Sequence, residues 1–268
     1  TKDGYDAAIA KDNQTRYDAF LKAIDETNRE RINAIDVINR YYNIQNIEYE
    51  ELIVPIREKH QAIFGYAEMI ADLKQKALDE KTAATGNHAD GDKAFYDVEE
   101  KNKALAESYT EEIKEILESF RTEVEKLAEG LYNERIKEAK ETLAAAEKVL
   151  TDAGYNKDVV SKAFGDVRTI ISDAETARKG VDFPLALDKI ITNFETIGEK
   201  IEAGYEPAAV SEWRYCYGRI EEMIDGEQAE MAKFEYLPNN TVNYDKKYAD
   251  EVVANYDAAI KIATEAES

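Results

Sequence analysis

Apolar residues recur every three or four positions along most of this chain, which is the spacing of one face of an α-helix. The first such stripe thins around Thr27, Asn28 and Arg31. Polar positions inside an apolar seam are typical of local solvent exposure or of a device that fixes helix register. The stripe itself comprises Tyr5, Ile9, Phe20, Ile24, Ile35, Ile38 and Tyr42. We therefore expect a long first helix.

A second helical stripe follows an interruption. We expect a break or kink between Asn43 and Pro55, because proline lacks the helix N–H donor and clashes with the preceding turn. After it, helical spacing indicates a helix that packs along another helix. The positions of this stripe are Ile56, His60, Ile63, Ala67, Ile70, Lys74 and Ala77.

The longest predicted helix covers residues 93–153, which contain no proline and a single glycine, Gly130. The polar stretch 85–92 precedes it as the clearest predicted loop, and Asp92 suits a helix N-cap. An unbroken helix over 93–153 would extend about 90 Å at 1.5 Å per residue. We favour the unbroken helix, and with it a rod, over a break at Gly130.

Shorter helices are predicted in the remaining chain. Gly154 has the position of a C-terminal glycine cap, and Asp182 with Pro184 marks a helix start. We expect helices at 158–179, from Asp182 to Gly204, from Pro207 to about Tyr236, and from Tyr244 to Ala266, with a turn at 237–240. No segment has the alternating pattern of a strand.

The pattern as a whole predicts an all-α protein of elongated antiparallel bundles with long, coiled-coil-like helices. We expect a first bundle in residues 1–125 and a second in residues 126–268, which share a long central helix. Their seams would also suit contacts between copies, so the sequence allows a homo-oligomer.

Charge narrows the range of partners. The chain has 57 acidic and 35 basic residues and a net charge of −22. Binding nucleic acid or anionic lipid surfaces depends on Lys and Arg, so neither is an expected partner. No run of about 18 apolar residues occurs, so we expect no membrane-spanning segment. We expect a protein or a surface component as partner.

Residues 143–197 resemble FIVAR-type modules, which are three-helix bundles of bacterial cell-surface proteins. The similarity rests on the stretch 143–150, on Tyr155, on Val160-Ser161-Lys162-Ala163-Phe164 and on Val181-Asp182, with apolar positions at Val167, Ile170, Ile171, Ala174, Leu187, Ile190 and Ile191. The resemblance covers about a fifth of the chain. It lacks the usual aromatic residue after the serine, and Ala177-Arg178-Lys179-Gly180 replaces the usual linker. It implies surface display and a role in adhesion or spacing.

The chain starts at Thr1, as a mature exported protein would, so we expect an extracytoplasmic or cell-surface location, with the cytoplasm as the alternative.

Candidate chemistry is sparse. The single cysteine, Cys216, allows no internal disulfide and lies among aromatic residues, so we expect it to pack. His60 lies on an apolar stripe without the Glu-x-x-His pairing of bundle metal sites. The loop around His88 fails the EF-hand pattern, because Gly86 would occupy its first ligand position. We therefore predict no enzyme, no metal and no cofactor.

Aromatic residues are the remaining functional signal. Val210, Trp213, Tyr217, Ile220 and Ile224 are spaced as a core seam, whereas Tyr215 points elsewhere. Aromatic side chains suit buried positions and binding surfaces alike. The candidate binding residues are Trp213, Tyr215, Tyr217 and Tyr236. We predict a non-enzymatic structural or interaction protein, an exported spacer or adhesion module. The alternative is a helical protein that binds a small ligand or glycan in an aromatic-lined pocket between helices.

Overall fold

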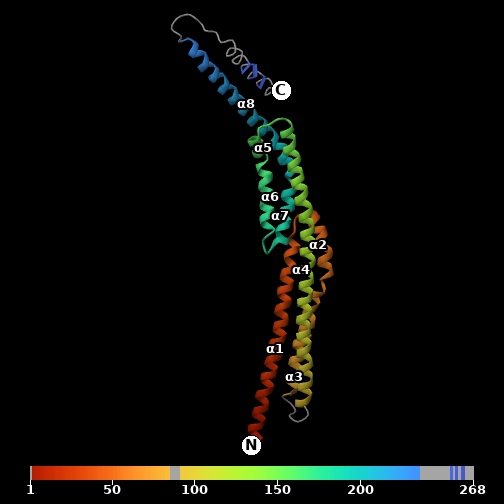
Figure 1. The fold of residues 1–268 in the computed structure, drawn as a ribbon. Coiled ribbons are helices and arrows are strands. Elements are labelled where there is room, and N and C mark those ends of the chain that lie inside the picture. The colour runs from red at the N-terminus through yellow and green to blue at the C-terminus, as the bar shows by residue number, and fades with distance from the viewer. Residues whose placement is uncertain (1, 85–90, 236–253, 256, 259–260, 263–268) are drawn as a thin grey trace. The chain divides into compact units, whose positions relative to one another are not determined.

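The computed structural model describes residues 2–84, 91–235, 254–255, 257–258 and 261–262 (Figure 1). Throughout this part of the chain the secondary structure is helical and no strand occurs, which confirms the all-α prediction. The chain forms two compact units. Unit 1 comprises Thr1–Asn133 and Arg178–Ile191, and unit 2 comprises Glu134–Ala177 and Thr192–Ser268. The sequence-based division instead had one boundary, between residues 125 and 126.

Unit 1 is a helical bundle built around α1 (Lys2–Arg40), α3 (Ala62–Ala84) and the first part of α4 (Gly91–Asp152). The helices lie side by side in Figure 1, and α1 packs along α3. Between α1 and α3 the chain forms η1 (Tyr41–Asn43) and α2 (Ile47–Lys59). The largest fully buried side chains of this unit are Phe20, Ile24, Ile38, Tyr49, Ile53, Ile63, Leu73, Ile113, Phe120, Leu187 and Ile191.

Thr27 is completely buried between α1 and α4, so the polar gap in the first stripe is not solvent-exposed. Its hydroxyl lies 2.9 Å from the Ala106 carbonyl and 2.9 Å from the Thr110 hydroxyl. A buried hydroxyl has to keep its hydrogen bonds, so sliding α1 along α4 would leave these groups unpaired. Of the two predicted explanations, the structure supports the register device.

The expected break between Asn43 and Pro55 is confirmed at residues 44–46, where the backbone is extended. Asn46 caps α2, since its side chain accepts the Tyr49 N–H at 3.1 Å. Pro55 itself lies inside α2 and does not end the helix. The carboxylate of Asp188, from the end of unit 1, accepts the backbone N–H of Asn46 at 2.7 Å. These bonds satisfy the polar groups of the extended segment.

The predicted stripe after Pro55 is partly wrong. The chain turns at residues 60–61, between α2 and α3, so the apolar positions do not follow a single helical period from one helix into the next. Ala67 is exposed, and Tyr66 and Leu73 are buried in its place. The buried positions of this region are Ile53, Arg57, His60, Ile63, Tyr66, Ile70, Leu73 and Ala77.

The long helix is confirmed: α4 contains 62 residues and continues through Gly130. It ends where predicted, because Gly154 has a φ of 87°. The N–H of Tyr155 donates to Leu150 O and the N–H of Gly154 donates to Thr151 O, both at 3.0 Å. This is the Schellman pattern of a helix C-terminus, in which glycine tolerates the left-handed backbone.

Unit 2 combines the end of α4 with α5 (Lys157–Ala163), α6 (Gly165–Ala177) and α8 (Ile197–Glu235). The single helix predicted at 158–179 is wrong, since the chain breaks at Phe164, whose ring is buried against Tyr205. Between α6 and α8, α7 (Phe183–Glu195) begins after Asp182 as predicted, and its residues belong partly to each unit.

The predicted boundary at Gly204 and Pro207 is also wrong. The chain breaks at Thr196 instead, where the Thr196 hydroxyl donates to Asn193 O at 2.7 Å. α8 then continues through Gly204 and Pro207. A Cβ on Gly204 would lie 2.9 Å from Ala163 O and 2.8 Å from Phe164 Cδ1, so this glycine allows α8 to approach the α5–α6 junction. The predicted turn at 237–240 lies outside the described residues, as does most of the predicted helix from Tyr244 to Ala266.

Candidate interaction surface

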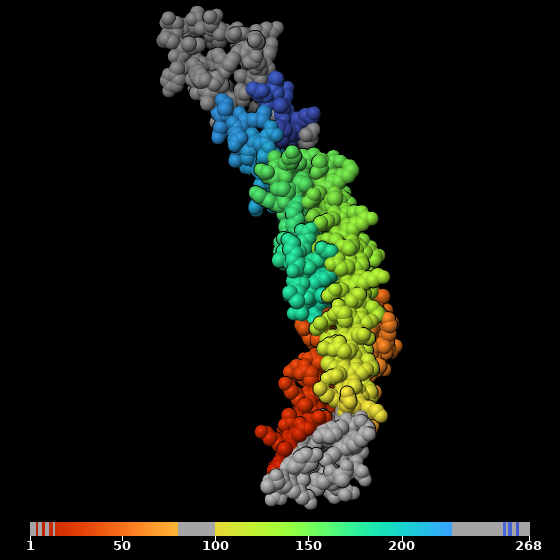
Figure 2. Space-filling view, turned by 60° about the horizontal axis from the view of Figure 1, so that its bottom comes forward, coloured from red at the N-terminus to blue at the C-terminus, as the bar shows by residue number. Residues whose placement is uncertain are grey.

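Exposed apolar and aromatic side chains lie along residues 210–224 of α8, a segment that is light blue in Figure 2. Ala208 is still buried against the bundle of unit 2. Beyond it, Trp213 and Tyr217 are each 48 % exposed, Val210 is 43 % exposed and Ile224 is 37 % exposed. The predicted core seam is therefore not a core, because no described residue covers these side chains to the extent a core requires.

The spacing of this face is that of a coiled coil. Val210, Tyr217 and Ile224 occupy position a of a heptad, and Trp213 and Ile220 occupy position d. The rings of Trp213 and Tyr217 stack, with centroids 5.3 Å apart and planes 19° apart. Stacking between neighbouring turns holds both rings along the helix and presents a broad apolar ridge. We call these five residues the a/d face.

Three of the four candidate binding residues are described by the structure, and they lie on two different sides of α8. Trp213 and Tyr217 lie together on the a/d face. Tyr215 is exposed on another side of α8, where the Arg219 guanidinium lies 5.9 Å from its ring centroid. Tyr236 lies outside the described residues. Sequence spacing predicts this division, since positions two residues apart on a helix point in different directions.

Charged and polar side chains flank the a/d face. Arg214 and Glu221, at the two e positions, are exposed. Cys216, at a g position, is half-buried, and its thiol lies 3.5 Å from a carboxylate oxygen of Glu212. The e side is therefore the open edge of the face, and its charges are of opposite sign.

His60 belongs to a chain of hydrogen-bonded side chains in unit 1. Its Nδ1 donates to Ile56 O at 2.8 Å, and its Nε2 lies 3.1 Å from the Ser119 hydroxyl. Ser119 in turn lies 3.2 Å from Glu123, which also pairs with Lys59. The hydrogen bond from Lys59 lowers the pKa of Glu123 below its usual value.

A serine hydroxyl beside a histidine resembles the nucleophile and base of a hydrolase. Acyl transfer also requires N–H donors directed at the developing oxyanion. Ser119 lies in the middle of α4, where the backbone N–H groups are used in the helix. The ring of His60 is buried and packs edge-on against Phe120 at 5.6 Å. This arrangement joins α4 to the α2–α3 turn.

Among the described histidine, cysteine, aspartate and glutamate side chains, no group of three or more could hold a metal ion. The predicted loop around His88 lies outside the described residues. Within the described ranges no helix is long and apolar enough to cross a membrane.

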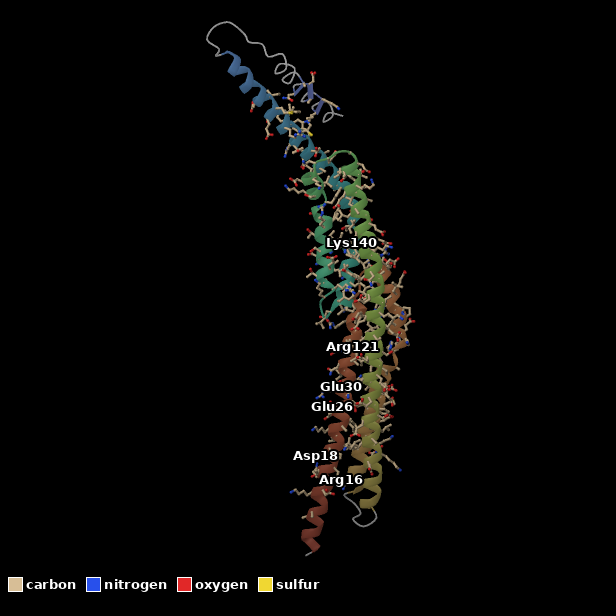
Figure 3. The ribbon with its side chains drawn as sticks, in the orientation of Figure 1. Arg16, Asp18, Glu26, Glu30, Arg121 and Lys140 are labelled. Atoms are coloured by element: carbon tan, nitrogen blue, oxygen red, sulfur yellow. The ribbon has the colours of Figure 1, made fainter. Side chains whose placement is uncertain are left out.

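Open grooves follow the line between α1 and α4 within unit 1. Figure 3 labels Glu26 and Glu30 on α1 and Arg121 on α4, which line these grooves. The larger groove has a volume of about 690 Å³, and its lining is Glu30, Asn33, Asp36, Val37, Arg40, Lys114, Leu117, Glu118 and Arg121. Neither lining contains an aromatic residue. These grooves therefore differ from the aromatic-lined pocket that the ligand-binding alternative requires.

Unit 2 has a smaller groove of about 300 Å³ between α4 and α6. Ion pairs span it: Lys140, labelled in Figure 3, pairs with Glu175 at 2.6 Å, and Arg168 pairs with Glu147 at 2.5 Å. Exposed pairs of this kind contribute about 0–1 kcal/mol each and mainly specify which helices lie together.

No family model matches the chain, and no curated protein or solved structure matches it.

Proposed function

We propose that this chain is a non-enzymatic structural and interaction protein that binds another helix through the a/d face of α8. The main observation that supports the proposal is the exposed stack of Trp213 and Tyr217 on the a/d face. A soluble helix gains stability when such a stripe is covered, because each apolar side chain removed from water contributes to the free energy of association.

We further propose that the protein is exported and displayed on a bacterial surface, where its bundles space or dock other components. Two features support this role. Residues 143–197 resemble FIVAR-type modules, and the outer faces of the helices carry a large excess of acidic side chains. Such charge keeps a displayed bundle solvated and prevents nonspecific association with anionic surfaces.

The interaction is tested with a photoreactive benzoylphenylalanine placed at Tyr217 in cells that produce the native protein. The expected result is a discrete crosslinked adduct, identified by mass spectrometry. The matched control places the same group at Tyr215, an exposed tyrosine of the same helix that lies off the a/d face. Absence of an adduct at Tyr217, or equal adducts at both positions, would contradict the proposed role of the face.

Surface display is tested separately by adding a protease to intact cells. A displayed protein is degraded without cell lysis, whereas a protein that survives until the cells are broken is not displayed. A cytoplasmic protein of the same cells provides the control for lysis.

A further inference from the structure

The a/d face is complementary to itself when two copies of α8 run antiparallel. In an antiparallel pair, an a residue of one helix packs beside a d residue of the other. With the twofold axis between residues 218 and 219, Trp213 packs against Ile224 of the second copy, and Tyr217 packs against Ile220 of the second copy. Each of these two layers joins one aromatic ring to one branched aliphatic side chain, and symmetry repeats both; Val210 lies outside them, opposite residue 227 of the second copy.

The flanking charges distinguish this register from its neighbours. In an antiparallel pair the e positions of the two helices face each other, so this register joins Arg214 to Glu221 of the second copy, twice. A shift of the axis to residue 215 would place Arg214 opposite Arg214. A shift to residue 222 would place Glu221 opposite Glu221. Like charges placed opposite each other are unfavourable, so only the central register satisfies both side chains.

A parallel pair lacks this complementarity. There the g position of one helix faces the following e position of the other. Cys216 would then lie opposite Glu221, without an ion pair.

We infer that the partner of the a/d face is a second copy of this chain, and that α8 forms an antiparallel homodimer centred between residues 218 and 219. This inference rests on the proposed function, because it names the occupant of the same face. The interface is isologous, so each substitution acts twice in one dimer. The net charge of −22 opposes association, and ionic strength near the physiological value limits that repulsion to about 8 Å.

The test measures mass in solution by light scattering across a dilution series of the full chain. The wild-type protein should change from dimer to monomer on dilution. Arg214→Glu and Glu221→Arg should each weaken the dimer about tenfold or more, since each creates two like-charge contacts. The combined variant should recover the wild-type dissociation constant, because exchanging both charges restores both pairs. Arg219→Glu is the matched control, because this arginine lies over Tyr215, off the a/d face.

A wild-type protein that stays monomeric at the highest concentration overturns the inference. So does a dimer that the single charge reversals leave unchanged, or one that the combined variant fails to restore. Circular dichroism confirms that each variant is folded. The crosslinking experiment separates this inference from the proposed function: an adduct of two copies at Tyr217 supports both, and an adduct with a different protein supports only the function. Without any adduct, both are wrong.

Discussion

Replacing Gly204 with alanine should destabilise unit 2, although alanine is the better helix former. The added Cβ would lie 2.8 Å from Phe164 Cδ1 and 2.9 Å from Ala163 O. Phe164 is buried and packs edge-on against Tyr205, and the carbonyl belongs to the backbone, so neither neighbour yields easily. Overpacking of a filled site costs about 1–3 kcal/mol, and removing a glycine from a helix recovers about 1 kcal/mol. We expect a net loss of up to about 2 kcal/mol.

The free energy of unfolding is measured by urea titration followed by circular dichroism. Gly218→Ala is the matched control in the same helix, since its Cβ would meet no atom within 4 Å. That variant should gain up to about 1 kcal/mol from helix propensity alone. The reasoning is refuted if Gly204→Ala is as stable as Gly218→Ala, because α8 then does not approach the α5–α6 junction closely.

Further predictions concern unit 1. Thr27→Val should lower the free energy of unfolding, measured by urea titration, by about 1–3 kcal/mol, because it removes a hydroxyl that bonds across to α4. The control Thr15→Val loses only a hydrogen bond within α1 and should cost less than about 0.5 kcal/mol. Arg57→Met should lower the free energy of unfolding by about 3 kcal/mol, because Arg57 is buried, pairs with Glu50 and donates to a backbone carbonyl at 2.6 Å. Arg29 belongs to an exposed ion pair, so a loss as small as that of Arg29→Met would contradict this reasoning. Burial and the hydrogen bond to a carboxylate raise the pKa of Tyr66 to about 12. The unfolded chain therefore loses this proton first, near pH 10, and stability should fall between pH 10 and about 12. In thermal melts, the melting temperature of Tyr66→Phe should fall less over that pH range than the melting temperature of the wild-type protein. An identical fall in both proteins would contradict the prediction.

Local signals in the sequence predict several helix ends correctly. Gly154 ends α4 because a left-handed backbone is needed there, and glycine adopts it without a steric cost. Asp182 and Pro184 mark the start of α7 because proline fits a first helical turn. In both cases the cause lies within a few residues of the chain, so a single sequence contains it.

Other boundaries depend on contacts between distant residues. Gly204 has the appearance of a helix terminator, yet it serves close packing against Phe164, which is 40 positions earlier in the sequence. Pro55 and Pro207 both lie inside helices, where packing of the flanking residues outweighs one lost hydrogen bond. The break at Phe164 has the same origin, since the ring is buried against α8. No local pattern contains this information.

Periodicity identifies which residues share a helix face, but burial also depends on a second surface. In the first stripe Phe20, Ile24 and Ile38 are buried, although Tyr42 is exposed and Tyr41 is buried in its place, whereas Val210, Trp213, Tyr217 and Ile224 of α8 are all exposed. Covering Val210, Trp213, Tyr217 and Ile224 would contribute about 1 kcal/mol for each half-exposed side chain, or about 8 kcal/mol for two helices. Association costs about 4–15 kcal/mol in lost translational and rotational freedom. Because the two quantities are of similar size, pairing through this face should be reversible and sensitive to concentration.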